Sequence, residues 1–563
     1  MAFNTDFFNQ RRAGILLHPT SLPETPGNGD LGQQAYNFIH FLADSAFTVW
    51  QMLPLGPPDE ELSPYQCQSV HAGNPLLISI ERLVDKGWLT TNSSPTTESE
   101  LAFEVKRLIE QGWLTEDHLE LGQRLEQRGL RDPFCLLPKR NAATRYRLGR
   151  LKEARAGFEK NADEADRTAF AEFIENNAEW LENYALFKAL QAEHHDNLRV
   201  ECLRGLNDIH SYEALKTRLS ELCSVAGWWG WSSELRDRDQ KALKEARQRL
   251  KESVEQHLFE QFVFFCQWQE LKHYAHDKGI YLFGDIPIFV AHDSADVWEN
   301  RDKFLLDAQG QPTVVAGVPP DYFSATGQRW GNPIYNWKAL QADGFRWWIS
   351  RLKSASVLFD LVRIDHFRGF EAYWSIPADC ETAIEGQWIK APGHTLFETL
   401  QNTEMNLSVV AEDLGVITDE VDALRERFGL PGMRVLQFAF GNDPTNPHLP
   451  HNHKEDSVVY TGTHDNNTTV GWFHELPDWE QQLVRDTLHT GEEMPWPLIE
   501  TAYASVGKLA VVPMQDILAL DGYHRMNTPG VGSGNWRWRF DWSQVPSDVC
   551  ARLRHLAHSH GRI

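Results

Sequence analysis

Eight short apolar runs, each ending in polar residues or in glycine and proline, are spread along the chain. Such runs are typical of buried parallel strands, which are hydrophobic on both faces. They lie at 14–19, 48–54, 280–287, 358–366, 407–415, 433–440, 457–466 and 509–518. Amphipathic segments of helix length separate several of them. Strands that alternate with helices in this way predict a (β/α)8 TIM barrel, an α/β fold, and the alternative is a six-stranded doubly wound sheet.

One of the intervening segments carries clear signals for both ends of a helix. In TDEVDALRERFG (418–429), Thr418 is a candidate N-cap, and Glu420 and Asp422 suit the first turn. Gly429 suits the C-terminal end, where a left-handed residue often stops a helix. We therefore expect a helix over this segment.

The uneven spacing of the apolar runs predicts two insertions in the barrel. Most of the gap between the second and third runs, 81–255, has helical periodicity and dense charges, which predicts a mainly helical inserted subdomain. The barrel would then consist of 1–80 and 256–563. After the third run, 286–345 is rich in glycine, proline and aromatic residues, so we expect a long loop that caps the active site.

Composition and charge restrict the class of protein. The chain has 563 residues, of which 42% are hydrophobic and 24% charged, as in ordinary soluble globular proteins. A net charge of −25 argues against nucleic acid and anionic membranes as partners. No apolar run reaches the roughly 18 residues of a membrane helix, and the segment MAFNTDFFNQRR lacks the apolar core of a signal peptide.

The cysteine pattern argues for reduced thiols in a cytoplasmic protein. Seven cysteines, an odd number, are scattered between Cys67 and Cys550 without a C-x-x-C pair. This pattern predicts neither a disulfide framework nor a zinc site.

Polar residues recur at the carboxyl ends of the predicted strands, where a barrel builds its active site. They are Asp285, Arg363, Asp365, Glu412, Asp413, His464, Asp465 and Asp516. Each one alone is also compatible with a solvated loop. Together, carboxylates from several strands facing one opening predict a site.

The segment LFDLVRIDHFRGF (358–370) shows this pattern most clearly. Residues i and i+2 of a strand share a face, so we expect Arg363 and Asp365 to point the same way. A neighbouring guanidinium lowers the pKa of a carboxyl group, which suits a carboxylate nucleophile. A plain ion pair between neighbouring strands would give the same pattern, and both interpretations stay open at this point.

Carboxylates on neighbouring strands suggest glycoside chemistry. Retaining enzymes of this kind hold a nucleophile and an acid/base carboxyl about 5–5.5 Å apart, and adjacent strands lie about 4.8 Å apart. Asp365 and Glu412 fit this arrangement, and the apolar stem SVVA (408–411) favours a raised pKa for Glu412.

The 21 tryptophans fit the same chemistry, because aromatic faces bind the flat apolar faces of sugars. Tyr65, Tyr322, Phe323 and Trp330 lie in loops after predicted strands. Trp347 and Trp348, in a helical context, are better interpreted as core residues, as are most of the others.

A series of longer motifs follows in order along nearly the whole barrel. They are SPYQ, HAGNP, GDIPIFV, GVPPDYFSATGQRWGNPIYNW, VRIDHFRGF, AEDLG, TGTHDN and GNWRWR. On these motifs the sequence resembles the amylomaltases, or 4-alpha-glucanotransferases, of the alpha-amylase clan. The helical insertion matches no such motif. The family usually lacks a C-terminal β-sandwich, and we expect none here, because only about 45 residues follow the last run.

The resemblance implies a role for each residue that stands in a family motif. Asp365 matches the nucleophile, Glu412 the general acid/base, and Asp465 the third carboxylate, which binds sugar hydroxyls. The substrate-binding residues that it implies are Arg363, His366, His464, Asp285, Tyr65, Asp321, Tyr322, Phe323, Gln328 and Trp330. The last six belong to the cleft wall and its covering loop, 317–332. Asn535 and Trp536 are expected to have a packing role. The family uses no metal or other cofactor.

The resemblance also implies an activity. We expect retaining transfer of an α-1,4-glucan segment from a maltooligosaccharide, or a starch- or glycogen-type glucan, to the 4-hydroxyl of an acceptor. Maltooligosaccharides and α-1,4-glucans would thus be the partners. The alternatives are an α-1,4-glucan hydrolase of the same clan and an inactive carbohydrate-binding barrel. An unrelated barrel enzyme for phosphorylated sugars is disfavoured by the net charge and by the lack of a basic glycine-rich loop.

Overall fold

A barrel of eight parallel strands forms the centre of the molecule. The computed structural model describes residues 6–25, 27–59, 61–90, 142–205, 212–320, 324–403, 405, 407–441 and 443–563. The barrel strands are β1 (Arg12–Leu16), β2 (Val49–Gln51), β3 (Tyr281–Pro287), β6 (Leu361–Asp365), β9 (Ser408–Ala411), β10 (Gly432–Val435), β11 (Ser457–Tyr460) and β12 (Leu509–Pro513). Each of the eight predicted runs overlaps one of these strands.

The sheet order shows how the barrel closes. Neighbouring strands follow the order β10-β11-β12-β1-β2-β3-β6-β9. The two edge strands also approach each other, since the Ala411 amide donates a hydrogen bond of 2.8 Å to the Pro431 carbonyl, directly before β10. The prediction of a TIM barrel is therefore confirmed.

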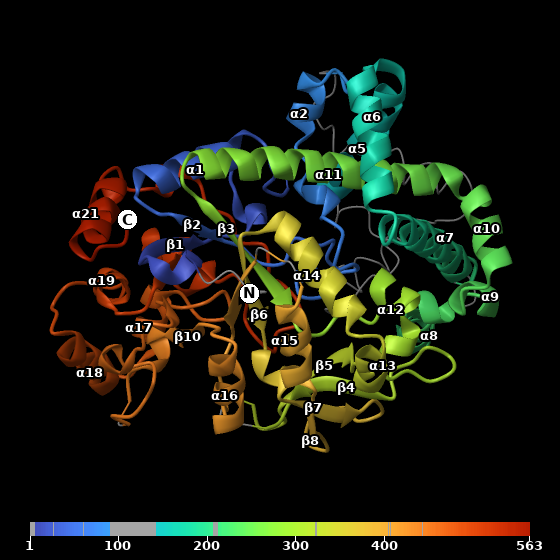
Figure 1. Ribbon diagram of the computed structural model, residues 1–563. Helices are drawn as coiled ribbons and strands as arrows, with labels where there is room; N and C mark the ends of the chain where they lie inside the picture. The colour runs from blue at the N-terminus through green and yellow to red at the C-terminus, as the bar shows by residue number, and fades with distance from the viewer. Residues whose placement is uncertain are drawn as a thin grey trace.

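Helices cover the outside of the barrel (Figure 1). They are α1 (Gln33–Asp44), α11 (Lys251–Asp277), α14 (Arg346–Leu358), α15 (Gly393–Gln401), α16 (Asp419–Arg427), α17 (Thr469–Glu475), α18 (Asp478–Leu488), α19 (Trp496–Ala504), α20 (Met514–Ile517) and α21 (Val549–Ser559). Helix α16 begins after Thr418, and Gly429 follows its end in the left-handed conformation, at φ 63°. The expected helix over 418–429 is thus confirmed.

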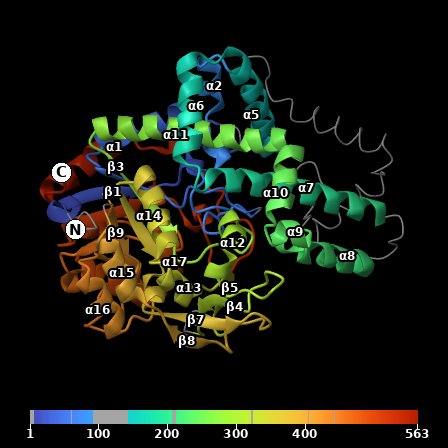
Figure 2. The same cartoon turned by 45° about the vertical axis from the view of Figure 1, so that its right-hand side comes forward.

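Further helices gather on one side of the barrel. They are α2 (Ile80–Asp85), α5 (Ala142–Asn161), α6 (Glu164–Asn176), α7 (Leu181–Gly205), α8 (Tyr212–Ser224), α9 (Ser233–Arg236) and α10 (Gln240–Arg249). Figure 2 shows them extending away from the strands, with α11 running from this group back to the barrel. The boundary that we expected at 255 falls inside α11, so the two parts share a helix. Residues 91–141 and 206–211 of the expected insertion lie outside the described residues.

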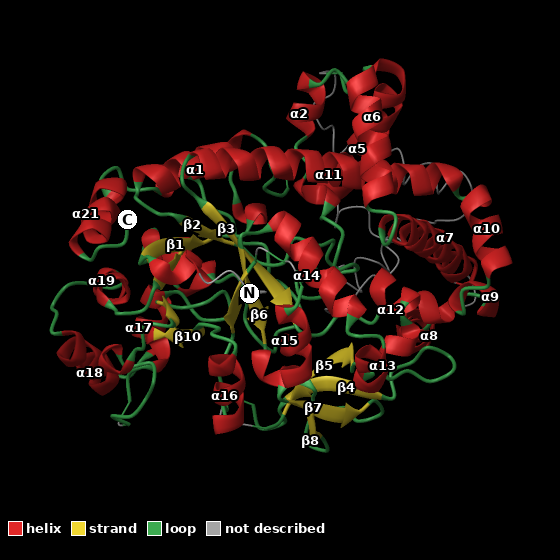
Figure 3. Ribbon diagram, in the orientation of Figure 1, coloured by secondary structure: helices red, strands yellow, loops and turns green. Residues whose placement is uncertain are grey.

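The segment 286–345, which we expected to be a long loop, contains regular structure. It holds α12 (Ala295–Glu299), β4 (Val314–Val318), β5 (Gln328–Pro333) and α13 (Trp337–Ala342). Strand β4 pairs antiparallel with β5 and with β7 (Ala372–Pro377), and β7 pairs with β8 (Gln387–Lys390). Figure 3 shows this second sheet beside the barrel. The loop expectation was wrong here because the strands that complete the sheet come from another part of the chain, after β6.

The core is rich in aromatic side chains. Trp347 and Trp348 are buried, as expected, and Trp268 donates its indole N–H to the Leu358 carbonyl at 3.0 Å. Cys67, Cys223, Cys266, Cys380 and Cys550 are free thiols. In the part of the chain that the structure describes, no helix is both long and apolar enough to cross a membrane.

Candidate active site

A buried arginine organises the carboxyl end of the barrel. Arg363 on β6 donates from Nη2 to Oδ1 of Asp365 at 2.5 Å and from Nη1 to Oδ2 of Asp285 at 2.7 Å. Asp285 lies on the neighbouring strand β3, directly opposite Arg363 in the register. The shared face that parity predicts for Arg363 and Asp365 is confirmed. Arg363 therefore does both things that the sequence left open: it holds Asp365 and it ties two strands together.

An aromatic wall stands next to this arginine. The Tyr65 hydroxyl donates to Oδ2 of Asp285 at 2.7 Å, and the Tyr65 ring stacks on His464 with 5.2 Å between centroids and 17° between planes. Trp536 packs against both rings, at 5.8 and 6.0 Å. Loops that follow β2, β11 and β12 thus meet at one place, although they are far apart in the sequence.

Glu412, at the end of β9, lies in a different environment. The residue is only 8% exposed, and its two carboxyl oxygens accept backbone N–H bonds from His366 at 2.6 Å and Leu414 at 2.8 Å. Burial raises the pKa of Glu412 to about 8, the Arg363 guanidinium opposes this, and the Asp365 carboxylate adds to it. The raised pKa that the apolar stem favours is confirmed. Glu412 is therefore mainly protonated at neutral pH.

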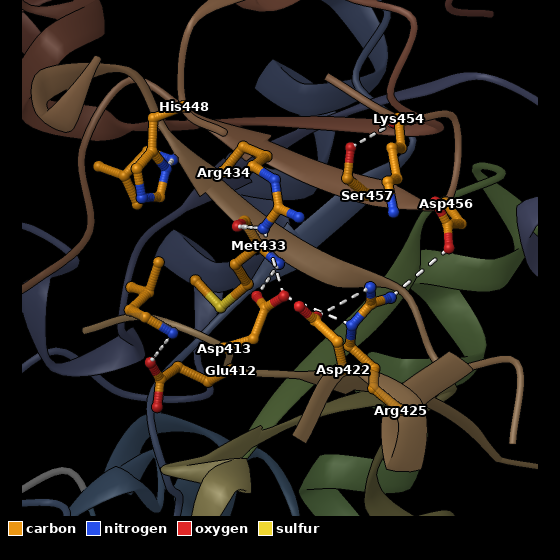
Figure 4. A network of polar contacts seen from close by, with 12 residues as sticks. Glu412, Asp413, Asp422, Arg425, Met433, Arg434, His448, Lys454, Asp456 and Ser457 are labelled. Atoms are coloured by element: carbon orange, nitrogen blue, oxygen red, sulfur yellow. Dashed lines mark hydrogen bonds and ion pairs between the residues drawn. The ribbon is translucent and has the colours of Figure 1, made fainter. Parts of the chain in front are cut away.

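The next residue, Asp413, does not belong to the site. Its carboxylate accepts from the Met433 amide at 2.6 Å and from Arg434 at 3.2 Å, and it forms an ion pair of 3.4 Å with Arg425 on α16. Figure 4 shows Asp413 among these partners, while Glu412 points away from them. Asp413 therefore binds the end of β9 to β10 and α16.

Asp516 is likewise a packing residue. Its carboxylate accepts from the hydroxyls of Thr461 and Thr469, at 2.6 and 2.7 Å, and from the Thr469 amide at 2.7 Å. The group is buried and fixes the loop that follows β11. Two of the polar residues noted at the strand ends are thus structural.

Asp465 in that same loop is more accessible. Its side chain is 45% exposed and that of Asp365 is 30% exposed, so both carboxylates reach open space. Asn527 donates to Oδ1 of Asp465 at 2.6 Å, and Arg525 donates to the Asp465 carbonyl at 2.9 Å. Sequence reasoning missed Asn527 and Arg525, and nothing in their local sequence pointed to them.

His366 links the end of β6 to Glu412 and to the second sheet. It is left-handed, with φ 53°, and this conformation directs its backbone N–H to Glu412. Its ring meets Trp330 on β5 edge to face, with 4.9 Å between centroids. Burial lowers the pKa of His366 to about 4, so the ring is neutral at neutral pH. Gln328 accepts the Trp330 indole N–H at 3.1 Å.

Comparison with known proteins decides the family. A family model described as 4-alpha-glucanotransferase matches residues 17–544. The chain belongs to the 4-alpha-glucanotransferase family. The resemblance inferred from the motifs is therefore confirmed.

Members of this family match the chain along nearly its whole length. The 4-alpha-glucanotransferase of Thermus thermophilus is 45% identical over 98% of this chain and 99% of its own. The chloroplastic/amyloplastic one of Solanum tuberosum is 40% identical over 99% of this chain and 87% of its own. An amylomaltase from Streptococcus agalactiae, solved in complex with acarbose, has a TM-score of 0.80 and 32% identity, and covers 98% of this chain and 100% of that one.

The other family-motif residues divide into two groups. Asp321, Tyr322 and Phe323 lie outside the described residues, so their place in the cleft stays a prediction. Asn535 accepts the Thr528 amide at 3.0 Å and donates to the Val531 carbonyl at 2.8 Å, which agrees with the packing role expected for it.

Among the described residues, no group of His, Cys, Asp and Glu side chains could hold a metal ion.

Proposed function

We propose that the protein is a retaining 4-alpha-glucanotransferase that exchanges segments between α-1,4-glucans. The observation that carries this proposal is a pair of carboxyl groups on neighbouring strands in opposite environments. Asp365 faces open space beside the Arg363 guanidinium, and Glu412 is buried with a pKa of about 8. One group is suited to attack and the other to donate a proton.

In the first step, Asp365 attacks the anomeric carbon of the donor glucan. The glycosidic bond breaks while Glu412 transfers its proton to the leaving oxygen, which gives a covalent β-glucosyl–enzyme. The Arg363 guanidinium holds the Asp365 carboxylate in position through its hydrogen bond. The stacked Tyr65 and His464 rings, with Asp465, would hold the sugar at this point.

In the second step, a second glucan enters on the side of Glu412. Glu412 takes the proton from the 4-hydroxyl of this acceptor glucan. The hydroxyl oxygen attacks the anomeric carbon at the same time, and the bond between that carbon and Asp365 breaks. Two inversions give a new α-1,4 bond with retained configuration. Trp330 and the loop 317–332 would exclude water and favour a sugar acceptor.

Several assignments belong to this proposal. The substrate-binding residues are Asp285, Arg363, His366, His464, Tyr65, Asp321, Tyr322, Phe323, Gln328 and Trp330. A mainly helical subdomain at 81–255 inserted in the barrel is a further part of it. A cytoplasmic location is also part of the proposal, and it rests on the cysteine pattern. The relative from Solanum tuberosum, by contrast, is named chloroplastic/amyloplastic.

Incubation with maltotriose tests the function. We expect glucose and a ladder of longer maltooligosaccharides, separated by chromatography. Only shorter products would instead favour the hydrolase, and no reaction would favour the inactive barrel.

Two variants test the roles of the carboxyl groups. Asp365→Asn and Glu412→Gln should each lower the transfer rate by at least about a thousandfold while staying folded. Glu420→Gln, on the exposed side of α16, is the matched control and should keep the wild-type rate. Near-normal turnover of either site variant would remove that residue from its role.

A further inference from the structure

A tryptophan on the second sheet is unusually exposed. Trp388 on β8 is 39% exposed, and it lies directly opposite Trp374 on β7. The two rings meet edge to face, with 5.2 Å between centroids and 65° between planes. Trp374 is itself fixed, since its indole N–H donates to the Ala383 carbonyl at 2.9 Å. An exposed ring held so firmly on one side is a candidate binding surface.

An arginine covers one face of this ring. The guanidinium carbon of Arg368 lies 3.8 Å from the centroid of Trp388. Arg368 is buried, and among the described residues no carboxylate lies within ion-pair distance of it. It donates a hydrogen bond to the Val416 carbonyl. The cation–π contact thus fixes the orientation of the indole, and the exposed part of the ring is left for a ligand.

The same arginine connects Trp388 to the active site. Arg368 lies in the short helix η8 (Phe367–Phe370), three residues after Asp365, and Val416 lies four residues after Glu412. The ring is therefore attached to both loops that follow the catalytic carboxyl groups. One of these two loops follows Glu412, the residue that acts on the leaving glucan and the acceptor in the proposed mechanism.

We infer that Trp388, held by Arg368 and Trp374, is a stacking platform for a glucose unit of the acceptor glucan, away from the exchanged bond. This inference rests on the proposed function. A flat ring next to polar groups suits a sugar, which presents an apolar face and a rim of hydroxyls. Lys390 lies two residues along β8, on the same face of the strand as Trp388. It forms an ion pair with Glu371, so charged groups that can bind sugar hydroxyls stand beside the ring.

The platform makes a distinct prediction about acceptor length. Free glucose occupies only the position next to Glu412 and does not reach Trp388. A longer maltooligosaccharide reaches both places and gains affinity from the second. Trp388 would therefore determine which acceptors the enzyme prefers.

The test compares two labelled acceptors with unlabelled amylose as the donor. Incorporation of label from glucose and from maltopentaose is measured for the wild type, Trp388→Ala and Trp388→Phe. In Trp388→Ala we expect the KM for maltopentaose to rise about five- to tenfold, as for the loss of one aromatic contact, and the KM for glucose to stay within about twofold. Trp388→Phe keeps a ring and should stay close to the wild type.

Trp479→Ala is the matched control, because Trp479 is 60% exposed on α18 and should not affect either acceptor. An equal loss with both acceptors in Trp388→Ala would show a structural role only, and no loss with either would exclude the platform. If the wild type transfers nothing, the proposed function fails. Calorimetric titration with maltoheptaose then still tests the platform. The platform requires that Trp388→Ala binds maltoheptaose more weakly than the wild type does. Equal binding by the two proteins, or no binding by the wild type, would overturn it.

Discussion

At the scale of single residues, two carboxyl groups of one chemical class acquire opposite properties from their surroundings. Asp365 is partly exposed and paired with a guanidinium, whereas Glu412 is buried and lies near another carboxylate. The same environment gives His366 a neutral ring and a backbone N–H aimed at Glu412. The proposed division of labour between nucleophile and acid therefore rests on burial and charge.

The raised pKa of Glu412 predicts the alkaline limit of activity. Only the protonated form can donate to the leaving oxygen, so the kcat/KM of transfer should fall tenfold per pH unit above about pH 8. Initial rates with maltotriose between pH 5 and 10 measure this limit. A rate that stays flat to pH 10 would contradict it.

The same group should affect stability in a defined pH window. The pKa of Glu412 is higher in the folded state, about 8, than its ordinary value of 4.5. Its contribution to stability is therefore fully present below pH 4.5 and is lost as pH rises through about 8. The Tm of Glu412→Gln minus that of the wild type should consequently rise over this window, as thermal melts would show.

The family motif selected Glu412 over Asp413, but the hydrophobic pattern alone does not distinguish the two residues. Both follow the same apolar strand, and both are carboxylates. Only the packing of α16 and β10 decides that Asp413 turns toward Arg425 and Met433. Asn527 was missed for a related reason, because its contact with Asp465 spans 62 positions of the chain.

At the scale of elements, the barrel strands were predictable because each is a continuous apolar run. Strands β4 and β5 were not, since β4 is completed by β7 from beyond β6, both contain glycine and β5 also contains proline. Their pairing depends on contacts remote in the sequence. It is this sheet that brings Trp330 to His366.

One buried ion pair joins the helical side of the molecule to the barrel. Arg147 on α5 donates to Asp30 at 3.0 Å and to the carbonyls of Asn28, Leu76 and Ile78. Arg147→Ala leaves Asp30 buried without its cation, so we expect the free energy of unfolding to fall by about 3–5 kcal/mol.

Denaturant unfolding of Arg147→Ala measures this loss. Lys152→Ala on the same helix is the control, because Lys152 is exposed and should change stability by less than about 0.5 kcal/mol. Equal effects of the two substitutions would contradict a specific role for the ion pair.

At the scale of the whole molecule, the two ends of the described chain meet at the barrel. Arg562 is buried and donates to the carbonyls of Arg12, Tyr503, Ser505 and Gly507, at 2.7–3.0 Å. These carbonyls lie in β1, in the last turn of α19 and between α19 and β12. Arg562 thus fixes the place where the first and last barrel strands pair.

Arg562→Ala should lower the free energy of unfolding by about 3 kcal/mol, because several buried carbonyls lose their donor. Transfer at low temperature should stay normal, since the hydrogen bonds that Arg562 donates among the described residues all go to carbonyls outside the candidate site. Arg554→Ala, at an exposed arginine on α21, is the control. A thermal melt of Arg562→Ala that matches the control would show that this contact does not stabilise the barrel.

The sequence by itself determined the eight barrel strands and the family, and it named Asp365 and Glu412 as candidates, because apolar runs and motifs are local. The tertiary structure decided which carboxylates face the site, how the second sheet forms and what surrounds Glu412. It also placed Trp388 on Arg368, which contacts the loop that follows Glu412. The direction of a side chain and its burial depend on residues remote in the sequence, and only the folded chain brings these together.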